Sequence, residues 1–243
     1  MISIKSWLVV WTLALVMALT SLSVQARINS VTEARLQSLN GLSNLLMFYN
    51  PSFENRDPGL QQQYWEAFED VRAWAAKQSY ANELSQPIDN LIKSIKRLEA
   101  EPEEYAHMRP VWINKVVQNH ARLEQLLQPH DKANTPETRM ALYLSMQNLA
   151  YQTGTFSSIN MLLMDGRPDI MELLDTEIEK ELTIIRQTVQ SKDLVTKLET
   201  RYQFIRPRLV GHQEKWVPNL VSYYYHSMVE LLGQIQSEPI VSG

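Results

Sequence analysis

Residues 170–189 read IMELLDTEIEKELTIIRQTV, which is the most regular pattern of the whole chain. Apolar residues recur there every three or four positions, as they do on one face of an α-helix. They are Ile170, Leu174, Ile178, Leu182, Ile185 and Val189. The acidic residues between them are expected to face solvent rather than to act as paired catalytic carboxylates. They are Glu172, Glu177, Glu179 and Glu181. The stretch therefore predicts one long amphipathic helix.

The same spacing extends over the chain on both sides of this helix, and typical start signals precede each segment. Ser30-Val-Thr-Glu33 has the form of a capping box, and Asp57-Pro58 and Thr135-Pro136 combine a capping residue with a following proline. Further helices are expected to begin at Pro87, Pro110, Pro168, Asp193 and Pro218, with breaks at Pro102, at Gly154 and at Pro207 to Gly211. No segment alternates as a strand does, so we predict an all-α fold of about eight helices.

The expected helix starts form two similar series. Ser30, Pro58, Pro87 and Pro110 are followed 105 to 110 positions later by Thr135, Pro168, Asp193 and Pro218. The last helices also share a pattern, His120-x-x-Leu-Glu124 and His226-x-x-Val-Glu230, at a shift of 106. The sequence thus predicts either one elongated bundle or two similar four-helix halves, at 27–129 and 135–236, with a loose tail at 237–243. Duplication is our interpretation, and chance similarity between amphipathic helices is the alternative.

The first 26 residues have the features of an export signal. Lys5 precedes an apolar run from Trp7 to Leu22, which is shorter than the roughly 20 residues of a membrane span. Ser23-Val-Gln-Ala26 then has the small residues of a cleavage site. We predict cleavage after Ala26 and a periplasmic or otherwise exported protein, and a retained N-terminal anchor is the alternative. No later stretch approaches the length of a membrane span.

Composition excludes several classes of function. The chain has no cysteine, which rules out disulfides, thiolate metal sites and thiol nucleophiles. Glycine makes up only about 3% of the chain, against about 7% on average, which argues against glycine-rich nucleotide loops. The net charge of −4 disfavours nucleic acid as a partner. Because no Gly-x-Ser-x-Gly motif occurs either, we expect no enzyme activity and no cofactor.

Two histidine–glutamate pairs are the best candidates for a metal site. His120 with Glu124, and His226 with Glu230, stand four positions apart and share a helix face. Ordinary hydrogen bonding is the commoner use of such a pair. Only 104–107 has the Glu-x-x-His spacing of di-iron bundles, and this segment lies between two prolines, where we expect a connector.

The segment from Arg201 to Tyr225 carries the strongest signs of a binding surface. Arginine, tyrosine and tryptophan are enriched where proteins bind one another. Three consecutive tyrosines also step by about 100° on a helix, so they cannot share one buried face. The candidate binding residues are Arg201, Arg206, Arg208, Trp216, Tyr223, Tyr224 and Tyr225. An aromatic corner packed inside the bundle is the alternative.

Part of the chain resembles a family of sensor modules. Arg139-Met140-Ala141, then Ile170 to Gln190, then Leu194 to Phe204 follow each other as in the periplasmic modules of type IV pilus-type methyl-accepting proteins. The resemblance covers about a third of the chain and implies ligand or partner sensing by a helical module. The Ser-Gln-Arg box of that family is missing after Met140, and no signalling helix follows, so it assigns no functional residue.

These observations together favour a non-enzymatic helical bundle of the cell envelope. We expect it to bind a protein partner or to serve as an accessory to an envelope assembly, and a homodimer is left open. The first alternative is a periplasmic module that binds or senses a small molecule, which requires a cavity between helices. The second is a four-helix bundle that binds a metal.

Overall fold

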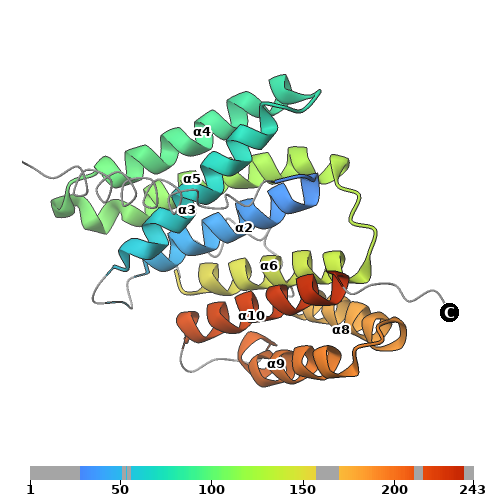
Figure 1. Ribbon diagram of the computed structural model, residues 1–243. Helices are drawn as coiled ribbons and strands as arrows, with labels where there is room; N and C mark the ends of the chain where they lie inside the picture. Colours follow the sequence, from blue (N-terminus) through green and yellow to red (C-terminus); the bar gives the residue numbers. More distant parts are fainter. Residues whose placement is uncertain (1–27, 51–52, 54–55, 157–169, 211–215, 238–243) are drawn as a thin grey trace, which may run out of the picture.

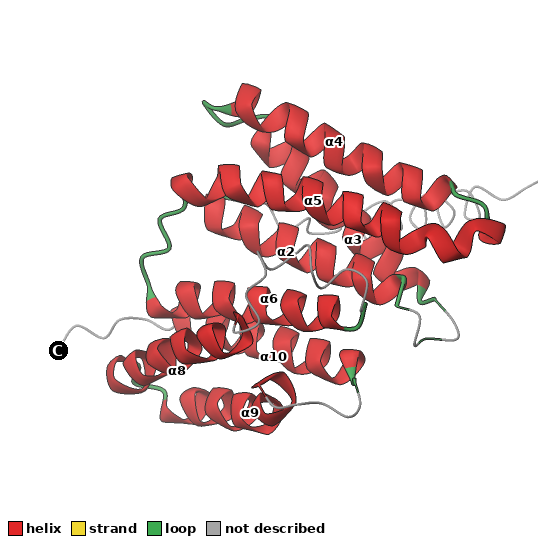
Figure 2. Ribbon diagram, turned by 180° about the vertical axis from the view of Figure 1, so that it is seen from behind, coloured by secondary structure: helices red, strands yellow, loops and turns green. Residues whose placement is uncertain are grey.

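The computed structural model describes residues 28–50, 53, 56–156, 170–210 and 216–237. The predicted export signal at 1–26, the residues around Pro168 and Gly211, and the end of the tail lie outside these ranges. The α-helices are α2 (Val31–Phe48), α3 (Pro58–Ala75), α4 (Ala81–Ala100), α5 (Arg109–Leu127), α6 (Pro136–Gly154), α8 (Ile170–Thr188), α9 (Lys192–Val210) and α10 (Pro218–Ser237). Two short 3-10 helices, η1 (Glu103–Met108) and η2 (Gln128–His130), flank α5. The described ranges contain no strand, which confirms the all-α prediction (Figure 2).

The predicted capping residues begin the helices as expected. The Ser30 hydroxyl accepts a hydrogen bond from the backbone N–H of Glu33 at 3.1 Å, and Thr135 accepts one from Thr138 at 3.3 Å. Asp57 accepts one from the N–H of Gly59 at 2.8 Å. Each of these bonds satisfies an N–H group that has no partner within its helix.

Two prolines lie inside helices that they were expected to bound. α4 begins at Ala81, before Pro87, because Leu84 is only 1% exposed and extends the buried face of the helix. α9 continues through Pro207 to Val210, and Leu209 is buried there. In both cases burial of a leucine outweighs the single backbone hydrogen bond that a proline cannot donate. Ser237 also belongs to α10 rather than to the tail.

The eight α-helices of the described ranges form two groups of four with the same order of contacts (Figure 1). In the first group, α2 and α4 each pack against both α3 and α5. In the second group, α6 and α9 each pack against both α8 and α10. Each group encloses its own apolar core, one around Phe68, Leu91 and Ile95 and the other around Ile178 and Leu198. This arrangement is the one expected of two similar four-helix halves.

The first helix of each half joins the two halves, because α2 packs along α6. Figure 1 shows α2 at the lower side of the first group and α6 at the upper side of the second. The contact between α2 and α6 is therefore the place where the two cores meet.

Among the described helices, none is both long and apolar enough to cross a membrane.

Candidate functional site

The helices around this contact carry polar atoms that lack partners. In the described part of the chain, nine buried side-chain nitrogen or oxygen atoms have no hydrogen-bond partner, and all nine belong to α2, α5 or α6. Buried polar groups in native proteins are nearly always paired, so such a concentration needs an explanation. The atoms belong to Ser38, Ser43, Asn44, Asn114, His120, Glu124, Gln147, Asn148 and Gln152.

A cavity of about 390 Å³ lies beside this contact, between α2, α5, α6 and α8. Its walls are mostly apolar, and its polar side chains are His120, Glu124, Gln128 and Thr153. The apolar lining residues are Leu39, Leu42, Val117, Ala121, Met146, Leu149, Ala150, Ile170 and Leu174. Both its volume and its few polar groups are typical of a small-molecule site.

His120 is the most unusual residue of this wall, because its side chain is only 3% exposed. Burial lowers the pKa of His120, although the charge of Glu124 and a hydrogen bond with the backbone of Ser38 act in the opposite direction. The imidazole is therefore neutral at pH 7. Its Nε2 atom is buried and has no hydrogen-bond partner among the described residues.

Glu124 stands one turn further along α5 and belongs to a buried ion network. Its Oε1 accepts hydrogen bonds from Arg35, one of them from Nε at 2.7 Å. Arg35 also pairs with Asp131, which accepts a hydrogen bond from the hydroxyl of Thr32 at 2.5 Å. Two carboxylates thus share one guanidinium group, and Oε2 of Glu124 is left buried without a hydrogen-bond partner in the described part.

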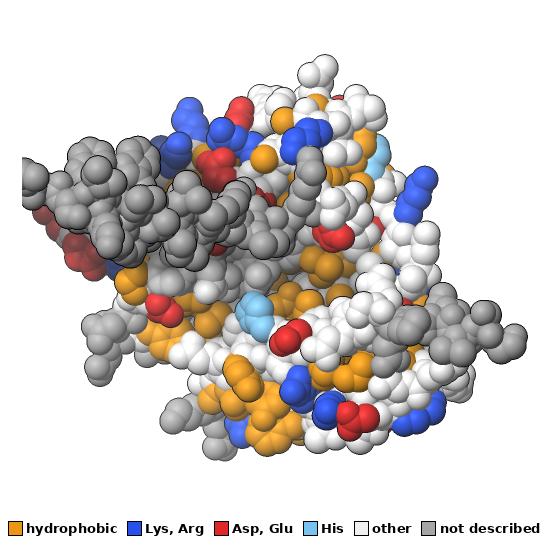
Figure 3. Space-filling view, in the orientation of Figure 1, with side chains coloured by type: hydrophobic (Ala, Val, Ile, Leu, Met, Phe, Trp, Pro, Cys, Tyr) orange, Lys and Arg blue, Asp and Glu red, His pale blue; other side chains and the backbone are white. Residues whose placement is uncertain are grey.

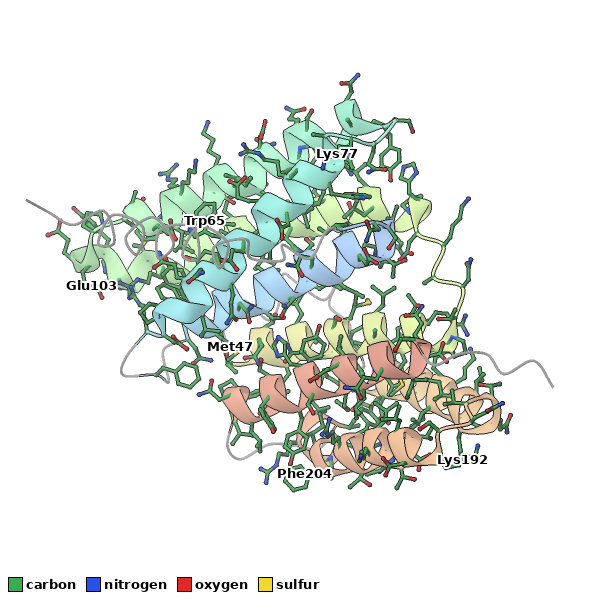
Figure 4. All side chains as sticks on the ribbon, viewed as in Figure 1. Met47, Trp65, Lys77, Glu103, Lys192 and Phe204 are labelled. Atoms are coloured by element: carbon green, nitrogen blue, oxygen red, sulfur yellow. The ribbon has the colours of Figure 1, made fainter. Side chains whose placement is uncertain are left out.

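A second cleft of about 740 Å³ lies between α2, α3 and α10 and contains His226, the counterpart of His120 at a shift of 106. Here both ring nitrogens have partners. Nδ1 lies 2.7 Å from the carbonyl oxygen of Ser222, and Nε2 lies 3.0 Å from Oδ1 of Asn40. His226 is exposed, yet the walls of the cleft remove enough water to lower its pKa. Met47, labelled in Figure 4, also lines this cleft.

The structure does not assemble a metal site around either predicted pair. Within the described ranges, no group of three histidine, aspartate or glutamate side chains is placed to hold an ion. Glu124 is bonded to Arg35, and Glu230 is exposed on α10. The 104–107 segment lies in η1, where Glu104 and His107 are exposed, as expected of a connector.

Three aromatic side chains of the predicted binding segment gather on the surface of α9 and α10. Phe204 is 51% exposed and Tyr223 is 69% exposed, and Tyr224 lies between them. The ring of Tyr224 is 4.9 Å from that of Phe204 and 5.5 Å from that of Tyr223, measured between centroids. Figure 3 shows hydrophobic side chains gathered at this lower edge of the molecule, where Figure 4 labels Phe204. We call these three residues the aromatic face.

The other candidate residues of the segment have structural partners. Tyr225 is buried and shares a 2.9 Å hydrogen bond with Ser145. Arg206 holds Asp175 with two bonds of 2.7 Å, and Arg201 donates to the carbonyl oxygen of Ser227. These contacts make Tyr225 and Arg206 part of the packing between helices.

Arg208 and Trp216 remain exposed at the two ends of the loop between α9 and α10. The ring of Trp216 packs edge-on against Tyr151, with 4.9 Å between the centroids. Arg208 and Trp216 are therefore exposed, while Arg201 and Arg206 are half-buried.

The prediction that Glu181 faces solvent is wrong. The residue is 2% exposed, and both its carboxylate oxygens accept hydrogen bonds of 2.7 Å from Arg139. An arginine on α6 thus draws one glutamate of the polar series into the bundle, which the spacing of the apolar residues alone does not reveal. Among the other three, Glu172 is exposed, and Glu177 and Glu179 are half-buried.

No family, curated protein or solved structure matches this chain in the comparisons with known proteins. The resemblance to pilus-type sensor modules stays a prediction.

Proposed function

We propose that this protein is an exported, non-enzymatic binding module that holds a small, largely apolar molecule in the cavity between its two halves. One observation carries the proposal. The described helices α2, α5, α6 and α8 line a cavity of about 390 Å³ whose wall is mostly apolar. Its volume and its few polar side chains, among them the buried imidazole of His120, are typical of sites that hold small molecules.

The position of the cavity supports the same function. It is bounded by α2 and α5 of one half and by α6 and α8 of the other, so a ligand would contact both halves. The export signal predicted at 1–26 would deliver such a module to the periplasm. The polar lining does not combine a nucleophile with a base, since the hydroxyl of Thr153 already donates to the carbonyl of Leu149.

Binding of an apolar fluorescent probe tests this function. Ala121 lines the cavity from an exposed position on α5, so Ala121→Trp would fill its mouth with little cost to folding. We expect N-phenyl-1-naphthylamine to bind the wild-type protein saturably at one site and Ala121→Trp to weaken that binding at least tenfold. Ala73→Trp, at an exposed alanine of α3, is the matched control and should bind as the wild type does. Unchanged binding by Ala121→Trp, or no saturable binding at all, would overturn the proposal.

The aromatic face supports a second candidate function, the docking of a protein partner of the cell envelope. Exposed aromatic side chains next to an exposed arginine, here Arg208, are the composition that protein interfaces favour. This candidate does not compete with the first, because the cavity and the aromatic face share no residue.

A capture experiment from envelope extract tests the second candidate. The double variant Phe204→Ser, Tyr223→Ser should lose a partner that the wild type retains. Tyr105→Ser removes an aromatic ring that is 48% exposed in the other half, and it should retain that partner. Identical sets of captured proteins for all three forms would exclude a role for the aromatic face.

A further inference from the structure

We infer that one exposed stripe of α10 binds a neutral oligosaccharide, with the ring of Tyr223 as the platform on which a sugar unit packs. The stripe consists of Asn219, Tyr223, His226, Glu230 and Gln234, which recur every three or four residues and are all exposed. It shares no residue with the cavity between α2, α5, α6 and α8. Binding of a sugar chain would therefore be a function beyond the one proposed for that cavity.

Two hollows lie along the stripe and meet at its centre. The cleft of about 740 Å³ is lined by Asn219, Tyr223 and His226. A second hollow, of about 450 Å³, lies between α9 and α10 and is lined by Tyr223, His226, Glu230 and Gln234. Since Tyr223 and His226 line both, the two hollows flank the same pair of side chains. At 1.5 Å per residue the stripe is roughly 22 Å long, so it suits an extended ligand.

Tyr223 presents an aromatic face where the two hollows meet. The residue is 69% exposed. Its ring meets that of Tyr224 at 89°, so this contact covers at most one of its two faces. The C–H groups on the face of a sugar ring are apolar and carry a weak positive charge, whereas the face of an aromatic ring is negative. Tyr223 can therefore hold one sugar ring flat, with the neighbouring units in the hollows on either side.

The polar side chains of the stripe match the hydroxyl groups of a sugar. The amides of Asn219 and Gln234 each donate and accept hydrogen bonds, and the carboxylate of Glu230 accepts them. Within the described ranges, these three side chains make no hydrogen bond or ion pair with another residue. A hydroxyl group also both donates and accepts, so neighbouring hydroxyls of a sugar can satisfy both ends of such an amide.

The charge of the walls favours a neutral ligand. Asp57 lines the cleft, and Lys197, Arg201 and Glu230 line the second hollow, which makes two anions and two cations. Loss of hydration lowers the pKa of His226, so its ring is neutral at pH 7 and the charges of the walls balance. An anionic ligand would meet Asp57 and Glu230 as like charges, and a cationic one would meet Lys197 and Arg201.

Two neutral tetramers test the inference. Cellotetraose and chitotetraose, the tetramer of N-acetylglucosamine, consist of rings with equatorial substituents, so both faces of each ring present C–H groups. We expect isothermal titration calorimetry at pH 7 to show binding of at least one tetramer at one site, at least tenfold more tightly than its monosaccharide. Binding of neither tetramer, or a monosaccharide that binds as tightly as its tetramer, would overturn the inference.

Variants of the aromatic ring locate the platform. Tyr223→Ala should weaken binding of the tetramer at least tenfold, whereas Tyr223→Phe, which keeps the ring, should change it less than threefold. Because Tyr223 is so exposed, neither change is expected to impair folding. Phe204→Ala is the matched control, since it removes another ring of the aromatic face that lines neither hollow, and it should bind as the wild type does. Unchanged binding by Tyr223→Ala would overturn the inference.

Variants of the amides test whether the ligand extends into both hollows. Asn219→Ala and Gln234→Ala remove the two ends of the stripe, and each should weaken binding of the tetramer at least twofold. Gln236→Ala removes an exposed amide of α10 outside both hollows and should have no effect. Wild-type binding by both Asn219→Ala and Gln234→Ala would contradict a site that spans the two hollows.

The outcomes also separate this inference from the proposed function. Ala121→Trp fills the mouth of the cavity between α2, α5, α6 and α8, and it should bind the tetramer as the wild type does. A protein that binds the tetramer but not N-phenyl-1-naphthylamine would overturn the proposed function alone. A protein that binds the fluorescent probe but neither tetramer would overturn the inference alone.

Discussion

The two halves use the same helix order but place equivalent histidines in different surroundings. His120 is buried in the wall of a cavity whose α6 side is formed by Met146, Leu149 and Ala150, and its Nε2 has no partner among the described residues. His226 is exposed, and the side chain of Asn40 on α2 lies within hydrogen-bond distance of its Nε2. Two halves with the same order of helix contacts can thus place a histidine at a similar position, while the facing helix of the other half decides what that histidine contacts.

The first helices of the two halves, α2 and α6, also carry similar residues in different surroundings. Residues 34–45, ARLQSLNGLSNL, align with residues 138–149, TRMALYLSMQNL, and both contain an arginine at the second position. Arg35 is buried and holds two carboxylates, whereas the side chain of Arg139 is 31% exposed and holds one, Glu181. The two arginines therefore pair with different neighbours, and the side chain of Arg35 is more deeply buried than that of Arg139.

The largest effect is expected from breaking the buried arginine network. Arg35→Met should lower the free energy of unfolding by about 3–5 kcal/mol, because it leaves Glu124 and Asp131 in the protein interior without their cation. Arg139→Met should cost less, about 1–3 kcal/mol, since it leaves one buried carboxylate, Glu181, without its partner instead of two. Urea denaturation at pH 7, followed by circular dichroism, measures both. Equal losses of unfolding free energy for the two variants would show that Arg35 and Arg139 contribute equally to stability.

The spacing of the apolar residues is enough to predict the type of the described helices and where most of them lie. Caps such as Ser30 and Thr135 could be located because their side chains act on their own helix, within three residues. Pro87 and Pro207 misled the prediction of boundaries, since the leucines buried beside them belong to a core that forms only when the helices meet.

The candidate site was harder to predict, because it depends on contacts across about 90 residues. The spacing in the sequence marks His120 and Glu124 as a pair, with hydrogen bonding as the commoner use and a metal site as the other interpretation. Nothing near Glu124 in the sequence shows that Arg35, 89 positions earlier, takes one of its oxygens. The cavity itself lies between helices of the two halves. In the sequence, its apolar lining residues cannot be distinguished from ordinary core residues. The shared pattern at a shift of 106 is the signal in the sequence that links both histidines.

A smaller effect should separate the two histidines by pH. Burial lowers the pKa of His120 in the folded state, so the unfolded chain binds its proton first as the pH falls below about 6.5. Stability contributed by this residue is therefore present above that pH and is lost on acidification, by at most about 1.4 kcal/mol per pH unit. Glu124 is the charged group on the same helix that opposes the shift, and it reduces the slope without reversing it.

Two matched variants measure this difference. His120→Phe should flatten the dependence of the unfolding free energy on pH between 7 and 5.5, because phenylalanine has no proton to bind. His226→Phe should flatten it less, since the pKa of His226 is also lowered but its exposed ring retains part of its hydration. Urea denaturation at several pH values gives both slopes. A larger change in this slope for His226→Phe than for His120→Phe would contradict the prediction. It would show that the fold lowers the pKa of His226 more than that of His120.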